Sequence, residues 1–136
     1  MLPDREQAEL FLSIIAPGET RFTFQTLDDS QDEKDPRLAR IVHGTLIEHL
    51  ALLASLNAQG AGVFVTINQT DFGGRKAENI VKVRCLFLDH DGTPLAQNFL
   101  VPHVVVETSA PEHLHEYWRA EGVTVERFSA FQKELM

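Results

Sequence analysis

Two aspartates, Asp89 and Asp91, are separated by one residue and followed by a glycine, at the end of an apolar segment that begins at Val81. The β-branched and aromatic residues of that segment alternate with a period of two, which predicts a β-strand. Residues i and i+2 of a strand lie on one face, about 6–7 Å apart, so both carboxylates are expected to project together. Such oxygen ligands suit Mg²⁺ or Mn²⁺, and these metals serve phosphoryl transfer. The alternative is a strand that simply ends in a turn, because aspartate and glycine both favour turns.

A second group of polar residues lies in the segment His113–Trp118, which is predicted to form another strand. Strand alternation places His113, His115 and Tyr117 on one face and Trp118 on the other, where we expect Trp118 to join the core. His115 lies between two polar neighbours and is therefore the best candidate for chemistry. The alternative is a structural role, because buried polar side chains are usually hydrogen-bonded.

Length and composition indicate one ordinary globular domain. The chain has 136 residues, of which 43% are hydrophobic and 24% are charged, enough for a real core. The single cysteine, Cys85, excludes a disulfide within the chain and is expected to be a small core residue. The N-terminus lacks the basic start of a signal peptide, and no apolar run approaches the ~20 residues that span a bilayer. We therefore expect a cytoplasmic protein with no membrane partner.

The charge pattern argues against broad, non-specific nucleic-acid binding. The formal net charge is −8, whereas such binding depends on positive charge. A local basic group nevertheless precedes the aspartates and comprises Arg75, Lys76, Lys82 and Arg84. Arg75 and Lys76 follow two glycines and are candidates for contact with a template or a triphosphate; the alternative is a solvated surface turn. By strand parity, Arg84 is expected to face away from Asp89.

Hydrophobic periodicity predicts an α+β fold with a mixed, largely antiparallel sheet. Helices are expected at 5–15, 37–58 and 128–135, and strands at 21–27, 63–68, 81–91, 103–107 and 113–118. The helix at 37–58 has the longest run of apolar residues at helical spacing. No internal repeat or domain boundary is visible, so residues 1–136 are treated as one domain.

The same motifs carry a resemblance to a known family. Several segments together resemble the RepB-like primase domain of plasmids and prophages, which belongs to the archaeo-eukaryotic primase superfamily of primase-polymerases; these segments are 22–26, 62–71, 74–81, 86–92, 105–109 and 115–118. The resemblance extends from about residue 7 to residue 135. It implies an RRM-like, palm-like catalytic half with flanking helices.

The resemblance implies roles for three catalytic residues. The first family motif, two aspartates flanking one residue at a strand end, matches Asp89 and Asp91 as ligands of Mg²⁺ or Mn²⁺. The second motif, a strand histidine two residues after a small residue, matches His115 and places it near the phosphates of the incoming nucleotide. A hydrogen bond from this histidine would stabilise charge beside the metals. The implied activity is primer synthesis on single-stranded DNA during plasmid or phage replication.

The resemblance also implies partners and shows two departures. Arg75, Lys76 and His113 are assigned to nucleotide or DNA binding, and the partners would be single-stranded DNA, nucleoside triphosphates and a replicative helicase. His113 stands where the family has a small residue. The family's third motif supplies another aspartate after the helix that begins near Phe128, and the sequence ends before it. We therefore expect an N-terminal part of a catalytic domain, incomplete at its C-terminus, with weak metal binding and little independent polymerase activity.

Two other functions compete with primer synthesis. A replication-initiation or nucleotide-binding module without catalysis would share the binding residues but lack the third carboxylate. A rolling-circle nickase is suggested by the histidine-leucine-histidine sequence at 113–115, a metal motif of that class. Its nucleophile would have to be Tyr117, the only tyrosine, which lies on the same predicted strand as the histidines and is badly placed to attack across their metal.

Overall fold

A computed structural model describes residues 5–30, 33–91, 102–107 and 113–135. Its helices are α1 (Arg5–Ile15), α2 (Leu46–Ala58) and α3 (Phe128–Leu135), with 3₁₀ turns at Pro36–Leu38, Ala77–Asn79 and Val125–Arg127. Its strands are β1 (Arg21–Asp28), β2 (Arg40–Thr45), β3 (Ala61–Val65), β4 (Gln69–Thr70), β5 (Ile80–Lys82), β6 (Cys85–Asp91), β7 (Val104–Glu107) and β8 (His113–Arg119). Within these ranges, no helix has both the length and the apolar character needed to cross a membrane.

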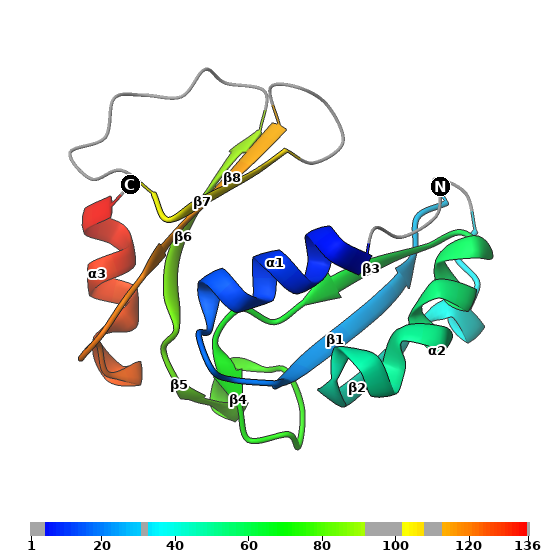
Figure 1. Cartoon of the computed structure of the whole chain (residues 1–136), viewed down its shortest axis with the longest axis horizontal. Coiled ribbons are helices and arrows are strands. Elements are labelled where there is room, and N and C mark those ends of the chain that lie inside the picture. The colour runs from blue at the N-terminus through cyan, green and yellow to red at the C-terminus, as the bar shows by residue number, and fades with distance from the viewer. Residues whose placement is uncertain (1–4, 31–32, 92–101, 108–112, 136) are drawn as a thin grey trace.

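The strands form three antiparallel sheets, which confirms the predicted α+β class. Their orders are β2-β1-β3, β4-β5 and β6-β8-β7. Helix α1 lies between the first and third sheets, α2 packs on the first sheet, and α3 runs along the outer side of the third (Figure 1). The small β4-β5 sheet lies at the end of the molecule opposite the C-terminal end of β6 (Figure 1).

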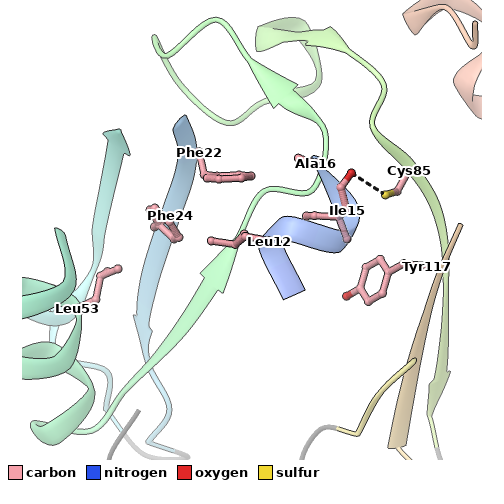
Figure 2. Close-up of a cluster of buried hydrophobic side chains, with 8 residues drawn as sticks. All are labelled: Leu12, Ile15, Ala16, Phe22, Phe24, Leu53, Cys85 and Tyr117. Atoms are coloured by element: carbon pink, nitrogen blue, oxygen red, sulfur yellow. Dashed lines mark hydrogen bonds between the residues drawn. The ribbon is translucent and has the colours of Figure 1, made fainter. Parts of the chain in front are cut away.

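Helix α1 joins the first and third sheets through a shared hydrophobic core (Figure 2). Its Leu12 packs toward Phe24 of β1, and its Ile15 faces the start of β6. Ile15 is 2% exposed. The thiol of Cys85 donates a hydrogen bond to the carbonyl oxygen of Ile15, with 3.7 Å between Sγ and O. Burial of these apolar side chains on α1 fixes the two sheets relative to each other.

The predicted helix at 37–58 is wrong in its first half, because Arg40–Thr45 forms β2 and the helix begins only at Leu46. Ile41 and Val42 are β-branched and pair with β1. Thr45 then caps α2: its hydroxyl accepts from the backbone N–H of Glu48 at 3.1 Å, and the Glu48 carboxylate accepts from the N–H of Thr45 at 3.0 Å. This capping box, a threonine followed three residues later by glutamate, is the sequence signal that marks the start of α2.

The predicted strand at 81–91 is two strands in two sheets. β5 pairs with β4, whereas β6 pairs with β8. Between them, the side-chain oxygen of Asn68 accepts from the backbone N–H groups of Arg84 and Cys85 at 2.8 and 3.1 Å. Arg84 therefore precedes the strand, so the parity argument for its direction does not apply. Its buried guanidinium donates to Glu19 at 3.2 Å and to the carbonyl oxygen of Arg21 at 3.0 Å.

The remaining predicted elements are confirmed with small changes in their bounds. The helices at 5–15 and 128–135 and the strands at 21–27, 103–107 and 113–118 correspond to α1, α3, β1, β7 and β8. The strand predicted at 63–68 is β3, which begins at Ala61 and ends at Val65. Trp118 and Cys85 are buried, as expected of core residues.

Candidate metal and nucleotide site

The pairing of β6 with β8 brings the predicted site positions together. In this antiparallel ladder Asp89 is directly opposite His115, and Asp91 is directly opposite His113. Opposed residues in such a ladder share one face of the sheet, with Cβ atoms about 4.5–5.5 Å apart. The backbone therefore places two carboxylate positions on β6 beside two imidazole positions on β8. The side chains of Asp89, Asp91 and His113 lie outside the described part of the structure.

Tyr117 closes one end of this face of the sheet. It is 8% exposed and is opposite Phe87 of β6 and Val104 of β7. The Phe11 ring of α1 packs edge-on against it, with centroids 5.0 Å apart and planes at 73°. His115, two residues nearer the aspartates, is only half-buried. The sheet is therefore more tightly packed at Tyr117 than at His115.

His115 and Tyr117 are in direct contact. A hydrogen bond of 3.2 Å joins Nδ1 of His115 to the Tyr117 hydroxyl, and the two rings meet edge-on with centroids 6.2 Å apart. This contact confirms that the two side chains share one face of the strand, as alternation predicted. It also shows that one nitrogen of the imidazole is engaged by a neighbour within the protein.

A groove of about 810 Å³ lies beside His115. Its walls come from α1, from β3 and from β7 and β8, and are mostly apolar; the lining includes Leu10, Ile14, Phe64, Ile67 and Val106. His115, Tyr117 and Gln7 contribute polar groups to the same lining. A largely apolar pocket with few polar groups, within the range of about 300–1,000 Å³, is typical of small-molecule sites. The groove thus offers space for an organic ligand next to the paired aspartate and histidine positions.

The basic loop is placed away from this groove. Arg75 and Lys76 are both exposed and lie between β4 and β5. The loop is held by Asn79, whose side-chain oxygen accepts from the backbone N–H of Lys76 at 3.1 Å. Figure 1 shows β4 and β5 at the end of the molecule opposite the C-terminal end of β6, which is Asp91, and β6 alone spans about 20 Å. The structure therefore does not bring Arg75 and Lys76 together with the aspartates.

One residue that sequence reasoning missed fixes the outer edge of β6. The backbone N–H of Phe87 donates to the side-chain oxygen of Gln132 at 3.2 Å, and the Gln132 amide donates back to the carbonyl oxygen of Phe87. This pair of hydrogen bonds anchors α3 to the strand two residues before Asp89. The sequence carries no signal for it, because the two residues are distant in the chain and glutamine is common on helices.

Cys85 is excluded as a reactive group at this site. Burial disfavours the charged thiolate and raises the pKa of Cys85 to about 11. The thiolate is the form that attacks electrophiles and binds metals. Cys85 therefore serves as a core residue at the base of β6, and the chemistry of the site depends on carboxylates and imidazoles.

The types of donor at the four paired positions fit a divalent cation. Carboxylate oxygens suit Mg²⁺ and Mn²⁺, and imidazole suits transition metals. Among the side chains that the structure describes, no group of three or more His, Cys, Asp and Glu is arranged to hold a metal. The side chains of Asp89, Asp91 and His113 lie outside that described part, so the paired positions on β6 and β8 stay the candidate metal site.

No protein-family model matches the chain, and comparisons with curated proteins and with solved structures find no match. The resemblance to RepB-like primases therefore depends on the sequence segments themselves.

Proposed function

We propose that this chain is part of the catalytic domain of a primase-polymerase, which joins nucleotides on a single-stranded DNA template during plasmid or phage replication in the bacterial cytoplasm. The observation that supports this most is the β6–β8 register. It pairs Asp89 with His115 and Asp91 with His113, so two motifs that are distant in the sequence meet on adjacent strands.

The chemistry follows from the residue types. In nucleotidyl transfer, a 3′-hydroxyl attacks the α-phosphate of a triphosphate and pyrophosphate leaves. Asp89 and Asp91 would hold Mg²⁺ or Mn²⁺, which when bound neutralises phosphate charge and activates the attacking hydroxyl. His115 would donate a hydrogen bond to a phosphate oxygen and stabilise the charge that develops there. The groove beside His115 would accommodate the base and sugar of the nucleotide against its apolar walls.

The placement of the basic loop divides the predicted binding residues into two groups. We assign His113 to the nucleotide, because it is opposite Asp91 in the ladder. Arg75 and Lys76 are assigned to the template, because a DNA strand is long enough to contact both ends of β6 whereas a triphosphate is not. A template contact by exposed cations also agrees with a chain whose overall charge is −8, since local phosphate contacts do not require a net positive protein.

Of the alternatives, the nickase is disfavoured by the surroundings of Tyr117. This residue is 8% exposed and is hydrogen-bonded to His115, whereas a nucleophile must reach a substrate phosphate. The non-catalytic module shares the groove and the paired positions with the primase proposal. Only the transfer reaction separates these two functions.

The test substitutes Asp89→Asn and Asp91→Asn one at a time, with Glu121→Gln as the control. Glu121 is exposed and follows the other end of β8. The assays are Mn²⁺-dependent binding of a labelled nucleoside triphosphate and primer synthesis on single-stranded DNA, performed with this chain and with any longer protein that contains it. Both activities should fall to background in the aspartate variants, with unchanged circular dichroism, and persist in the control.

Full activity in either aspartate variant would contradict the proposed metal site. Metal-dependent nucleotide binding that needs both aspartates, without incorporation in any version of the protein, would instead favour the non-catalytic module.

A further inference from the structure

Arg21, at the start of β1, is an exposed cation that lies on an aromatic ring. Its guanidinium carbon is 4.3 Å from the centroid of the Phe72 ring. Within the described part of the chain, its side chain makes no hydrogen bond or ion pair. By contrast, Lys82 and Arg84 both bond to Glu19. A guanidinium has five N–H donors in a planar fork, so those of Arg21 are available to a ligand.

The ring beneath Arg21 is held in an unusual backbone conformation. Phe72 has a φ of 61° and is the one described residue other than glycine with a positive φ. Bulky residues rarely adopt this left-handed region, and those that do are fixed by their surroundings, often at ligand-binding sites. The N–H of Phe72 donates to the hydroxyl of Thr70 at 3.0 Å, and the ring of His43 packs edge-on against it with centroids 6.0 Å apart. These contacts hold the ring against Arg21.

The acidic side chains nearest to this stack along the strands are already engaged. Asp71, next to Phe72, accepts from the N–H of Gly73 at 2.8 Å and from the amide of Asn79 at 3.2 Å. Glu48 follows Thr45, the strand partner of Arg21, and accepts from the N–H of Thr45 at 3.0 Å. Neither carboxylate forms an ion pair with Arg21. The free donors of Arg21 therefore suit an anion from outside the protein.

The loop that contains Phe72 also carries the exposed cations Arg75 and Lys76. We propose that Arg21, positioned by Phe72, joins these two residues and binds a phosphate of single-stranded DNA. This inference rests on the proposed function, which assigns the loop to the template. A guanidinium can donate two N–H groups to one phosphate, and a ring that restricts the side chain lowers the entropy lost on binding. Because β1 contacts β4, Arg21 extends the basic surface of the loop onto the first sheet (Figure 1).

The first measurement is fluorescence anisotropy of a labelled oligothymidylate, without metal or nucleotide. Arg21→Met should weaken binding about three- to tenfold at low salt and reduce the slope of log K against log salt by about 0.7, the value for one phosphate on a single strand. Arg40→Met is the matched control, because Arg40 is exposed and lies opposite Thr26, at the other end of the β1–β2 ladder. It should weaken binding less than about twofold, since screening limits the effect of distant charges. Equal losses in the two variants would overturn the proposal.

The second measurement tests Phe72 as a positioning residue through its coupling with Arg21. Phe72→Leu should weaken binding about two- to fivefold, the range of an exposed cation–π contact, but have no further effect in Arg21→Met. Phe72→Tyr keeps the ring and should keep the affinity. Additive losses, or the same loss in Phe72→Tyr, would overturn the positioning role. If the unsubstituted protein binds no oligothymidylate, the inference fails, whereas nucleotide binding in the aspartate variants still decides the metal site.

Discussion

The first and third sheets both have three strands, yet they place their polar residues differently. In the first sheet the central strand β1 buries two threonines whose hydroxyls are engaged inside the protein. Thr26 donates to the carbonyl oxygen of Leu38 at 2.7 Å, and Thr23 bonds to the hydroxyl of Thr70 at 2.7 Å. In the third sheet the central strand β8 instead carries His115 into the lining of an open groove.

This difference separates the roles of the two sheets. The first sheet satisfies the two buried threonines of β1 within the protein and packs on α2, so it acts as a scaffold. In the third sheet, Tyr117 is packed against Phe11, and the β6–β8 ladder places the positions of Asp89, Asp91, His113 and His115 farther along the two strands. Substitutions in the parts that join or support the two sheets should change stability, whereas substitutions at these four positions of the third sheet should change ligand binding.

The largest loss of stability is expected at Ile15, where α1 joins the two sheets. Ile15 is 2% exposed, whereas Ile47 at the start of α2 is 69% exposed. Ile15→Ala should lower the free energy of unfolding by about 2–5 kcal/mol, because it leaves a cavity between the sheets. Ile47→Ala should change it by no more than about 0.5 kcal/mol. Denaturant unfolding measures both, and similar values for the two variants would show that α1 does not join the sheets as described.

A smaller effect is expected at Arg84, which connects the start of β6 to the first sheet. Arg84 and Lys82 both bond to Glu19, at 3.2 and 3.5 Å, but the Arg84 side chain is 2% exposed and that of Lys82 is 58% exposed. Arg84→Met should cost about 2–3 kcal/mol, because buried hydrogen bonds of a charged group are lost. Lys82→Met should cost less than about 1 kcal/mol, since exposed ion pairs contribute little. Equal losses would contradict a specific role of Arg84 between the sheets.

The smallest effect concerns the cap that begins α2 on the first sheet. Thr45→Ala should cost about 1 kcal/mol in denaturant unfolding. Thr124→Ala is the matched control, because Thr124 precedes a 3₁₀ turn without a side-chain cap bond and should change little. A loss at Thr124 as large as that at Thr45 would argue against the capping box.

The same cap predicts a pH dependence. Hydrogen bonds from the backbone and side chain of Thr45 lower the pKa of Glu48 below its usual 4.5. A lowered folded-state pKa means that the stabilisation is present above the unfolded-state pKa and is lost as pH falls through the folded-state pKa. The stability advantage over Glu48→Gln should therefore disappear in acid. An advantage that stays constant through this range would show that the carboxylate makes no such bond.

Local patterns in the sequence predicted much of the fold but not the contacts between distant segments. Alternation identified β1, β7 and β8, and helical spacing identified α1 and α3, because these signals depend on neighbouring residues. The helix predicted from residue 37 was wrong where pairing with β1 overrides the apolar spacing. The break between β5 and β6 depends on Asn68, whose hydrogen bonds to the backbone of Arg84 and Cys85 have no local signature.

In the candidate site, too, local patterns predicted some features, whereas contacts between distant segments could not be predicted. The spacing of Asp89 and Asp91 predicts a shared face, and alternation predicted the shared face of His115 and Tyr117. The alignment of β6 with β8 could not be predicted, because the register between strands joined by a long connection is set by tertiary packing. The anchoring of β6 by Gln132 is likewise a contact between distant segments. The roles of these residues in metal and nucleotide binding stay predictions.

The proposed metal and nucleotide site is tested most directly by locating the residues at which a paramagnetic ion binds. Mn²⁺ titrated into the ¹⁵N-labelled protein broadens the amide signals of nearby residues even when binding is weak. We predict that broadening appears first at 87–91 and 113–117, the paired segments of β6 and β8, and is lost in Asp89→Asn. Broadening centred on other acidic residues, such as Asp28 and Asp35, or an unchanged pattern in Asp89→Asn, would contradict the proposed metal and nucleotide site.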